Sequence, residues 1–446
     1  MELSGKRVVV VGLGKSGVAA AKLCLSRGAT VIGTDSAPAE KISAEARALG
    51  IELVLGGHAE AQFERANLIV VSPGVPNLPE LTAAENAGVE VIGELELSSR
   101  FIEAPIVAIG GTNGKSTTTT LVGDMFLAAG LKTFVGGNLG TPSAEAVGKD
   151  YDVVVFEVSS FQLERVPSFQ PRVSVLLNIT EDHLDRYPSF IAYAEAKGNA
   201  FHSQSPDDFA IIPDNDDDCR RQASRGKATQ LTFGSYGDYS VSGRVVVETR
   251  SGEIFDLDQT ALHGRHNLDN AAAAIAAARA LDLTPSAIRK ALAAFKPLPH
   301  RMARVAQVRG VTFYDDSKGT NVGASVTALR GLSEARGVLI AGGRDKQGAY
   351  EPLVSALEDK ARALVLIGEA ADRIAAAVND RVPTLRADSM DDAVDKAFSQ
   401  AEPGDAVLLS PACSSFDMFK SYADRGEQFV AAVQRLAARH SQPEAP

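Results

Sequence analysis

The stretch IVAIGGTNGKSTT, residues 106–118, decides the fold class of this chain. A short apolar run predicts a buried strand over Ile106–Ile109, and the residues from Lys115 to about Ala129 predict a helix. The glycine-rich turn between them offers consecutive backbone N–H groups at a helix N-terminus, where phosphate groups bind well. A strand, a glycine turn and a helix in this order predict an α/β domain built on a parallel sheet.

This turn departs in one respect from the pattern G-x-x-x-x-G-K-[ST], because Ile109 occupies the place of the first glycine. We still expect it to bind a nucleoside triphosphate, with Lys115 at the β- and γ-phosphates and Ser116 on Mg²⁺. The alternative is a fortuitous glycine turn. The residues predicted to hold the nucleotide here are Gly111, Thr112, Asn113, Gly114, Lys115, Ser116 and Thr117.

Apolar strands alternate with helices on both sides of this segment. The first part of the chain predicts strands at Val8–Val11, Thr30–Thr34, Leu68–Val71 and Glu90–Ile92, with helices at Ser16–Arg27 and Ser43–Leu49. After the punctuation Lys296-Pro-Leu-Pro299, strands are expected at 312–315, 338–341, 363–367 and 406–409. Between these parts lie an alanine-rich helix, Leu268 to Leu281, and an acidic patch, 214–218, which we expect to be a solvated loop. We predict three domains with bounds at 1–93, 94–298 and 299–446.

The composition excludes several classes of protein. The chain has 446 residues, and 56 acidic against 45 basic residues give a net charge of −11, which disfavours nucleic-acid binding. Three cysteines, far apart, form neither a disulfide framework nor a zinc site. We see no targeting signal and no membrane-spanning stretch, so we expect a cytoplasmic protein.

A second glycine turn, Gly12-Leu-Gly-Lys-Ser-Gly17, also follows a predicted strand and opens a helix. Asp35 ends the next strand, at the distance of about 20 residues that a dinucleotide-binding motif expects. Gly14, Lys15, Ser16 and Gly17 could therefore hold a dinucleotide or another diphosphate. A tight turn with only a structural purpose is the alternative.

Two acidic or histidine-containing segments suggest a metal site. The strand 151–157 ends in Glu157, and a carboxylate at the carboxyl end of a parallel strand is a suitable metal ligand. A solvated carboxylate at a strand end is the alternative. The segment 180–187 groups acids around His183, which favours a functional role for that histidine.

Lys197 is the most informative single residue. Phe190, Tyr193, Lys197 and Phe201 follow at helical spacing after Ser189, so they lie on one face that is expected to point inward. One interpretation is a lysine whose amine snorkels to water. The other is a partly buried amine with a lowered pKa and a chemical role.

At these residues the sequence resembles the Mur ligase family over essentially its whole length. The resemblance rests on 111–117, 157–163, the segment around His183, His266–Asn270 and His300-Arg301. Two long blocks, 316–321 and 409–417 followed by 422–429, resemble the D-glutamate-adding members of that family.

The resemblance implies three domains: a Rossmann-like N-terminal domain, a central P-loop-type ATPase domain with a mostly parallel sheet, and a Rossmann-like C-terminal domain. It implies an ATP-dependent ligase that adds D-glutamate to UDP-N-acetylmuramoyl-L-alanine through an acyl phosphate, in the synthesis of peptidoglycan precursors. The pathway builds the cell wall and so serves cell shape and division. The implied partners are these small molecules alone, with no nucleic acid and no membrane, and we expect a monomer.

The resemblance also assigns residues. The implied catalytic residues are Lys115, His183, Lys197, Asn267, Asn270, Arg301 and Asp316, and the last three also contact the nucleotide. The implied substrate-binding residues are Gly14, Lys15, Ser16, Gly17, Asp35, Ser36, Gly74, Asn138, Ser159, His183, Lys318, Thr320, Lys346, Ser415 and Tyr422. The implied ligands of two Mg²⁺ ions are Ser116, Glu157, His183 and a carbamylated Lys197.

Three other functions compete with this one. A nicotinamide-dependent oxidoreductase would use the turn at Gly12–Gly17 but leave the loop at 111–118 without a purpose. A nucleotide-binding module without catalysis would bind ATP only. Folate polyglutamate ligases share the ATP loop, but the blocks 316–321 and 410–417 do not resemble theirs.

Overall fold

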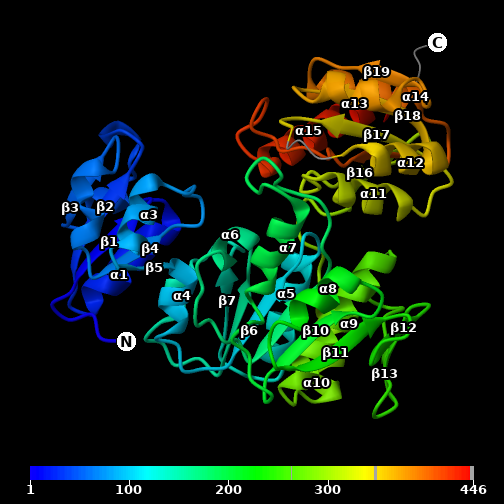
Figure 1. Cartoon of the computed structure of the whole chain (residues 1–446). Coiled ribbons are helices and arrows are strands. Elements are labelled where there is room, and N and C mark those ends of the chain that lie inside the picture. Colours follow the sequence, from blue (N-terminus) through cyan, green and yellow to red (C-terminus); the bar gives the residue numbers. More distant parts are fainter. Residues whose placement is uncertain (263, 346–348, 442–446) are drawn as a thin grey trace. The chain divides into compact units, whose positions relative to one another are not determined.

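The computed structural model describes residues 1–262, 264–345 and 349–441 (Figure 1). Two compact units are distinguished, one comprising 1–179, 191–260 and 268–295, the other 180–190, 261–267 and 296–446. The longest segment of the second unit begins at Lys296, the first residue of the proline-containing segment 296–299 that the sequence suggested as a domain boundary. The finer bounds at 93 and 298 stay a prediction.

The N-terminal part of the first unit is a parallel five-stranded sheet in the order β3-β2-β1-β4-β5. Its elements are β1 (Arg7–Val11), α1 (Lys15–Ser26), β2 (Thr30–Asp35), η1 (Ala39–Lys41), α2 (Ala44–Arg47), β3 (Glu52–Leu55), η2 (Ala59–Ala61), η3 (Phe63–Arg65), β4 (Leu68–Val71), α3 (Pro79–Asn86) and β5 (Glu90–Gly93). Val8 and Val10 belong to one apolar cluster, Val9 and Val11 to another. Because alternate side chains of a strand point to opposite faces, both faces of this sheet are covered, as the continuous apolar strands predict.

The turn between β1 and α1 needs glycine at two points. Gly12 has φ +86°, and a Cβ on Gly17 would lie 1.8 Å from the carbonyl oxygen of Gly12. The first turn of α1 therefore passes directly over the end of β1, closer than any side chain at position 17 would allow.

The central sheet of the first unit has nine strands in the order β14-β13-β12-β11-β10-β9-β6-β8-β7. Its strands are β6 (Ile106–Gly110), β7 (Thr133–Gly137), β8 (Val153–Glu157), β9 (Val173–Leu176), β10 (Phe209–Pro213), β11 (Thr229–Gly234), β12 (Tyr239–Ser242), β13 (Val245–Glu248) and β14 (Glu253–Asp256). Its helices are α4 (Glu94–Ser99), α5 (Lys115–Ala128), η4 (Ser143–Ala146), α6 (Ser160–Leu163), α7 (Phe190–Gly198), α8 (Asp217–Ala223), α9 (Arg265–Ala280) and α10 (Pro285–Ala294). The strands from β7 to β12 pair in parallel, whereas β12, β13 and β14 form an antiparallel extension that the sequence analysis did not predict.

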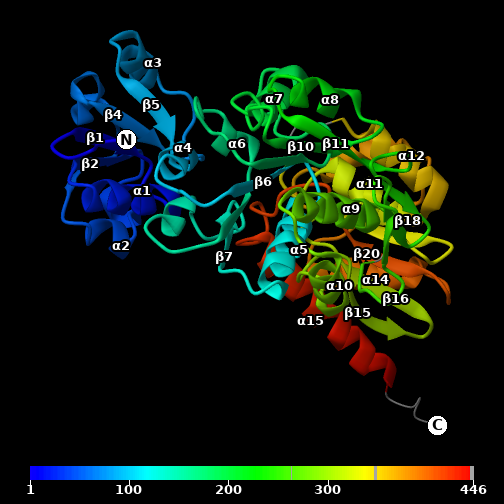
Figure 2. The same cartoon turned by 90° about the horizontal axis from the view of Figure 1, so that it is seen from below.

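Helices α5 and α10 pack against each other in this unit (Figure 2). In α9, the side chains of Ala271 to Ala278 are all buried, because small side chains let this helix pack closely against its neighbours. The acidic patch at 214–218 is not simply a solvated loop. Asp216 caps α8 by accepting a hydrogen bond from the backbone N–H of Cys219, and the next two aspartates lie in its first turn.

The second unit holds a six-stranded sheet in the order β15-β16-β20-β17-β18-β19, in which β15 and β16 pair antiparallel and the other described pairs are parallel. Its elements are β15 (Ala303–Val308), β16 (Val311–Asp315), α11 (Val322–Arg330), β17 (Gly337–Gly342), α12 (Glu351–Lys360), β18 (Ala361–Ile367), α13 (Ala371–Val378), β19 (Thr384–Arg386), α14 (Met390–Gln400), β20 (Ala406–Leu409) and α15 (Tyr422–Ser441). Two apolar clusters cover its faces. In the described ranges, no helix is both long enough and apolar enough to cross a membrane.

The turn at Gly12–Gly17 yields a stability prediction. G17A places a methyl group against a backbone oxygen, so we expect the free energy of unfolding to fall by more than about 2 kcal/mol. Urea unfolding followed by circular dichroism measures the loss. G14A is the matched control, because a Cβ on Gly14 meets nothing within 4 Å. Equal losses in the two variants would contradict this explanation of the turn.

Candidate active site

The loop between β6 and α5 holds its lysine against its own backbone. The Lys115 Nζ donates hydrogen bonds to the carbonyl oxygens of Gly111, at 2.9 Å, and Thr112, at 2.7 Å. Gly111 and Gly114 have φ values of +137° and +87°, which open the loop into a curve ahead of the helix. The lysine amine therefore lies at the curved loop, and phosphate binding there stays a prediction.

Asn178 secures this loop from the neighbouring strand, and the sequence analysis missed it. Its Oδ1 accepts a hydrogen bond from Asn113 N at 2.9 Å, and its Nδ2 donates to Asn113 O at 3.1 Å. The backbone carbonyl of Asn178 also accepts from Thr112 N at 3.0 Å. The only signal in the sequence was a polar residue directly after an apolar strand, which is too common to single out.

Helix α9 meets the loop through Asn270. A Cβ added to Gly114 would lie 2.3 Å from Asn270 Oδ1, so the amide of Asn270 lies directly against the loop. Two residues that the sequence analysis placed at the nucleotide thus come together in the same unit.

Lys197 points inward, as its helical spacing predicted. Its side chain is 3% exposed, its Nζ donates to Gly111 O at 2.9 Å, and it lies 4.6 Å from the ring centroid of Tyr193. The Tyr193 hydroxyl in turn contacts Thr112 Oγ1 at 3.1 Å. The snorkelling alternative is therefore wrong, and two lysine amines share one carbonyl oxygen.

Glu157 ends β8 beside the loop, because β8 pairs with β6 and Glu157 is opposite Ile109. It is 3% exposed, which rules out the solvated alternative. Its Oε1 accepts a hydrogen bond from Asn138 Nδ2 at 2.6 Å, whereas its buried Oε2 has no hydrogen-bond partner within the described residues. A buried carboxylate oxygen left without a donor suits a cation, so the residues present fit a bound Mg²⁺.

The first glycine turn is tied to Asp35. One carboxylate oxygen of Asp35 accepts from Leu13 N at 2.7 Å and the other from Ala37 N at 2.8 Å. Gly14, Lys15, Ser36 and Gly74 are exposed at this end of the sheet. Ser16, next to Lys15, is half-buried, and Ser159 forms a capping box with Gln162 at the start of α6.

Asp316 is a buried carboxyl group of the second unit with a raised pKa. The loss of hydration raises its pKa to about 7, against the opposing effects of a hydrogen bond from Ser410 and the charge of Arg301. Ser410 Oγ donates to Asp316 Oδ2 at 2.7 Å, and Met302 N donates to Oδ1 at 3.3 Å. Arg301 and Asp316, which the resemblance assigns to the nucleotide, thus interact electrostatically.

Arg425, which the sequence analysis also missed, joins the two specific blocks. It is fully buried on α15 and donates to the carbonyl oxygens of Ser317, at 2.9 Å, and Cys413, at 3.2 Å. Lys318 lies 3.8 Å from the ring centroid of Tyr422, so these two predicted residues form a cation–π pair. Burial raises the pKa of the Cys413 thiol to about 11, which agrees with a packing role.

His183 lies in the second unit with a left-handed backbone, φ +56°. Its backbone N–H donates to Asp182 Oδ1 at 2.9 Å, and Asp182 Oδ2 accepts from Asn321 Nδ2 at 3.0 Å.

The other predicted site residues lie as follows. Thr320 is half-buried and Ser415 is buried. Asn267 opens α9 with a backbone hydrogen bond to Gly264 O, and Lys346 lies outside the described residues.

Comparison with known proteins identifies the family. The sequence matches the MurD-like N-terminal domain of Mur ligases over residues 6–93, the Mur ligase middle domain over 109–278, and the Mur ligase glutamate ligase domain over 300–413. The chain belongs to the Mur ligase family. The resemblance and the three-domain α/β fold expected from the sequence are thereby confirmed. Membership of this family favours a ligase over the alternative of a nicotinamide-dependent oxidoreductase.

Individual Mur ligases match over the full length. The chain is 45% identical to the UDP-N-acetylmuramoylalanine–D-glutamate ligase of Geotalea daltonii, over 98% of this chain and 99% of the relative. The enzyme of the same name from Trichlorobacter lovleyi is 44% identical, over 98% and 100%. A pseudomurein peptide ligase type C from Methanothermus fervidus, 19% identical, shares the fold with a TM-score of 0.63 over 97% of this chain and all of that one.

The pKa of Asp316 predicts a pH-dependent stability. In the unfolded chain the carboxyl ionises near its ordinary value of 3.8, whereas the folded protein keeps the proton up to about pH 7. The native state therefore binds more protons in this window, and stability falls as pH rises through it. Melting temperatures measured from pH 5 to pH 8 should fall less for D316N than for the wild type.

A variant of Ser410 gives a second test of the pH dependence of the melting temperature. Its hydrogen bond favours the charged carboxylate, so S410A should move the transition to higher pH. Parallel melting curves for the wild type and D316N would show that Asp316 does not titrate in this range.

Proposed function

We propose that this chain is an ATP-dependent ligase that joins D-glutamate to UDP-N-acetylmuramoyl-L-alanine and releases ADP and phosphate. The observation that carries the proposal is the group of functional side chains at the carboxyl ends of β8, β6 and β9: Glu157, the loop with Lys115, and Asn178. This is the place where open α/β sheets bind ligands. The full-length similarity to relatives that bear the name of this ligase supports the choice of substrates.

The chemistry requires activation of a carboxylate, because a carboxylate is a poor electrophile. The alanyl carboxylate of the UDP-sugar would attack the γ-phosphate of ATP, forming an acyl phosphate and releasing ADP. Lys115 and the backbone N–H groups of the loop would stabilise the charge on the transferring phosphoryl group. The neutral amine of D-glutamate would then attack the acyl carbon, and phosphate would leave from a tetrahedral intermediate.

Each predicted residue has a role in this scheme. Ser116, Glu157, His183 and a carbamylated Lys197 would hold up to two Mg²⁺ ions, which neutralise phosphate charge when bound. Asn267, Asn270, Arg301 and Asp316 would contact the nucleotide, and Lys318 would contact the substrate. The first glycine turn with Asp35, Ser36 and Gly74 would hold the UDP moiety, and Asn138 and Ser159 the sugar diphosphate side of the substrate. Thr320, Lys346, Ser415 and Tyr422 would position D-glutamate, and His183 would act as base or orienting group for its amine.

An acyl phosphate hydrolyses in water, so we also propose that the domains close around it, with Lys296–Pro299 as the hinge. A cytoplasmic, monomeric enzyme remains part of the proposal.

The test is release of ADP by the purified chain. Release should require both UDP-N-acetylmuramoyl-L-alanine and D-glutamate, and a panel of amino acids defines the specificity. K115A should reduce the rate by a factor on the order of 100 or more, whereas K132A, an exposed lysine paired with Asp150, should not. Release with a different amino acid would indicate a sister ligase, and ATP binding without turnover would indicate a non-catalytic module.

Carbamylation of Lys197 has its own test. The neutral amine would attack CO₂, forming an N–C bond and releasing one proton, which turns a cation into a carboxylate ligand. The inward position and the nearby Lys115 amine favour this loss of positive charge. Protein equilibrated with ¹³C-bicarbonate should show a carbamate carbon signal by NMR that is absent from K197M. A wild-type spectrum without that signal would contradict the modification.

A further inference from the structure

A segment of the central sheet extends into the core of the N-terminal sheet. Residues 138–147, which we call the strap, connect β7 to β8 and include η4. Ala144 of the strap belongs to the same buried cluster as Val8, Val10 and Leu97, and Val147 packs against that cluster. One end of the strap is therefore part of the hydrophobic core beneath β1.

The other end of the strap holds the proposed metal ligand. Asn138 Nδ2 donates to Glu157 Oε1 at 2.6 Å, and Asn138 N donates to the carbonyl of Glu157 at 2.9 Å. A Cβ on Gly137 would lie 2.4 Å from that carbonyl, so the two backbones touch. Any movement of the strap would change the surroundings of the Glu157 carboxylate directly.

Glu94 anchors the strap at the N-terminal sheet. It opens α4 directly after β5, is 1% exposed, and its Oε1 accepts a hydrogen bond from Ala144 N at 2.7 Å. Ser143 Oγ donates to Ser98 Oγ at 3.0 Å, and Ser98 Oγ donates to the carbonyl of Glu94 at 2.7 Å. Burial raises the pKa of Glu94, against the opposing effect of the hydrogen bonds from Ala144, Ser143 and Ser98.

Helix α1 completes the connection. It starts at the first glycine turn and packs against both η4 and α4. The contacts therefore run without a gap from the proposed diphosphate site, through α1 and the strap, to Glu157.

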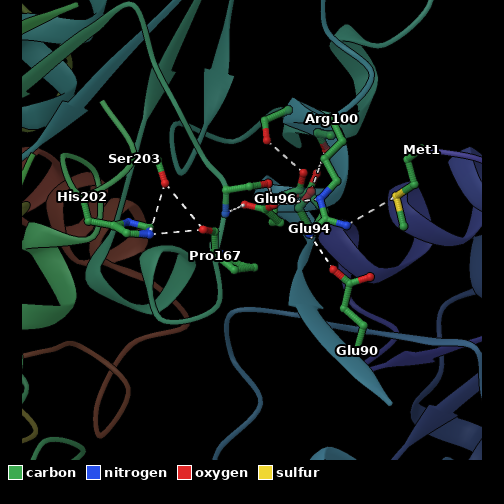
Figure 3. A network of polar contacts seen from close by, with 11 residues as sticks. Met1, Glu90, Glu94, Glu96, Arg100, Pro167, His202 and Ser203 are labelled. Carbon is green, nitrogen blue, oxygen red and sulfur yellow. Dashed lines mark hydrogen bonds and ion pairs between the residues drawn. The ribbon is translucent and has the colours of Figure 1, made fainter. Parts of the chain in front are cut away.

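Glu96 provides a natural comparison on the same helix (Figure 3). It is also fully buried, but it pairs with Arg100, at 2.7 Å, and accepts hydrogen bonds from Ser168. Among the described residues, Arg100 and Ser168 lie outside the strap. Glu94 therefore contacts the strap, whereas Glu96, two residues further on and equally buried, contacts Arg100 and Ser168.

We propose that Glu94 is a positioning residue that, through the strap, couples the UDP-sugar site to the Glu157 carboxylate. The UDP-sugar site and the metal ligand in this inference rest on the proposed function, but the first experiment does not depend on them. A UDP-sugar bound at the first glycine turn would restrict the motion of α1 and η4. It would thereby also restrict Asn138 and the Glu157 carboxylate to which Asn138 donates a hydrogen bond.

The first experiment is hydrogen–deuterium exchange on the whole protein without nucleotide, metal or substrate. E94A removes the acceptor of Ala144 N, so the strap amides should exchange about tenfold faster, the factor that one buried hydrogen bond supplies. E94Q keeps an oxygen acceptor at the same place and should leave exchange within about twofold of the wild type. E96A, the matched control, should leave the strap at the wild-type rate whatever its effect on melting temperature.

The second experiment measures ADP release against Mg²⁺ concentration. E94A should raise the half-saturating Mg²⁺ concentration about tenfold and leave the KM for D-glutamate unchanged, whereas E96A should change neither. If the wild type releases no ADP, the proposed function fails, but the exchange result still decides whether Glu94 anchors the strap.

Faster strap exchange in both E94A and E96A, or equal damage from E94Q and E94A, would overturn the proposal. So would an unchanged Mg²⁺ dependence in an active E94A. If E94A does not fold, S143A replaces it, since this variant removes the hydroxyl that contacts Ser98 and Glu94 and keeps the Glu94 carboxyl group in place. It should accelerate strap exchange at an unchanged melting temperature, and wild-type exchange in S143A would overturn the anchoring role.

Discussion

The carbonyl oxygen of Gly111 accepts hydrogen bonds from two lysine amines, Lys115 and Lys197, at 2.9 Å each. Two positive charges this close repel each other, and Lys197 is removed from water. The arrangement becomes favourable when negative charge is brought to the loop or when one amine loses its charge. In the proposed function, a triphosphate would supply the first and a carbamate the second, so both proposals address the same pair of contacts.

The surrounding structure keeps that loop in place before any ligand arrives. Asn178, just beyond the end of β9, closes it with hydrogen bonds in both directions, and Asn270 lies against Gly114 from α9. Glu157 stands on β8, the strand on the other side of β6. Because three adjacent parallel strands end at one edge, residues distant in the sequence meet there without a long loop to carry them.

Sequence reasoning located most of these features where the signal was local and periodic. The apolar run at 106–109 became β6, and the spacing of Tyr193 and Lys197 correctly indicated an inward face, although it left open whether the amine reached water. Features that depend on tertiary contacts were not found. Asn178 and Arg425 act on the backbone of distant segments, and the strands β12 to β14 are four residues each, too short for a clear pattern. The helix cap at Asp216 was hidden in a run of acids whose composition resembles a loop.

The insertion of the strap beneath β1 has a practical consequence for work with parts of this chain. A recombinant fragment that stops at Gly93 would keep α1 but lack Leu97, Ala144 and Val147, which belong to or pack against the same apolar cluster. Part of that cluster would then meet water, and an uncovered apolar patch promotes aggregation. Expression of the first five strands in soluble form therefore calls for α4 and a graft of residues 143–147, not merely a cut at the end of β5.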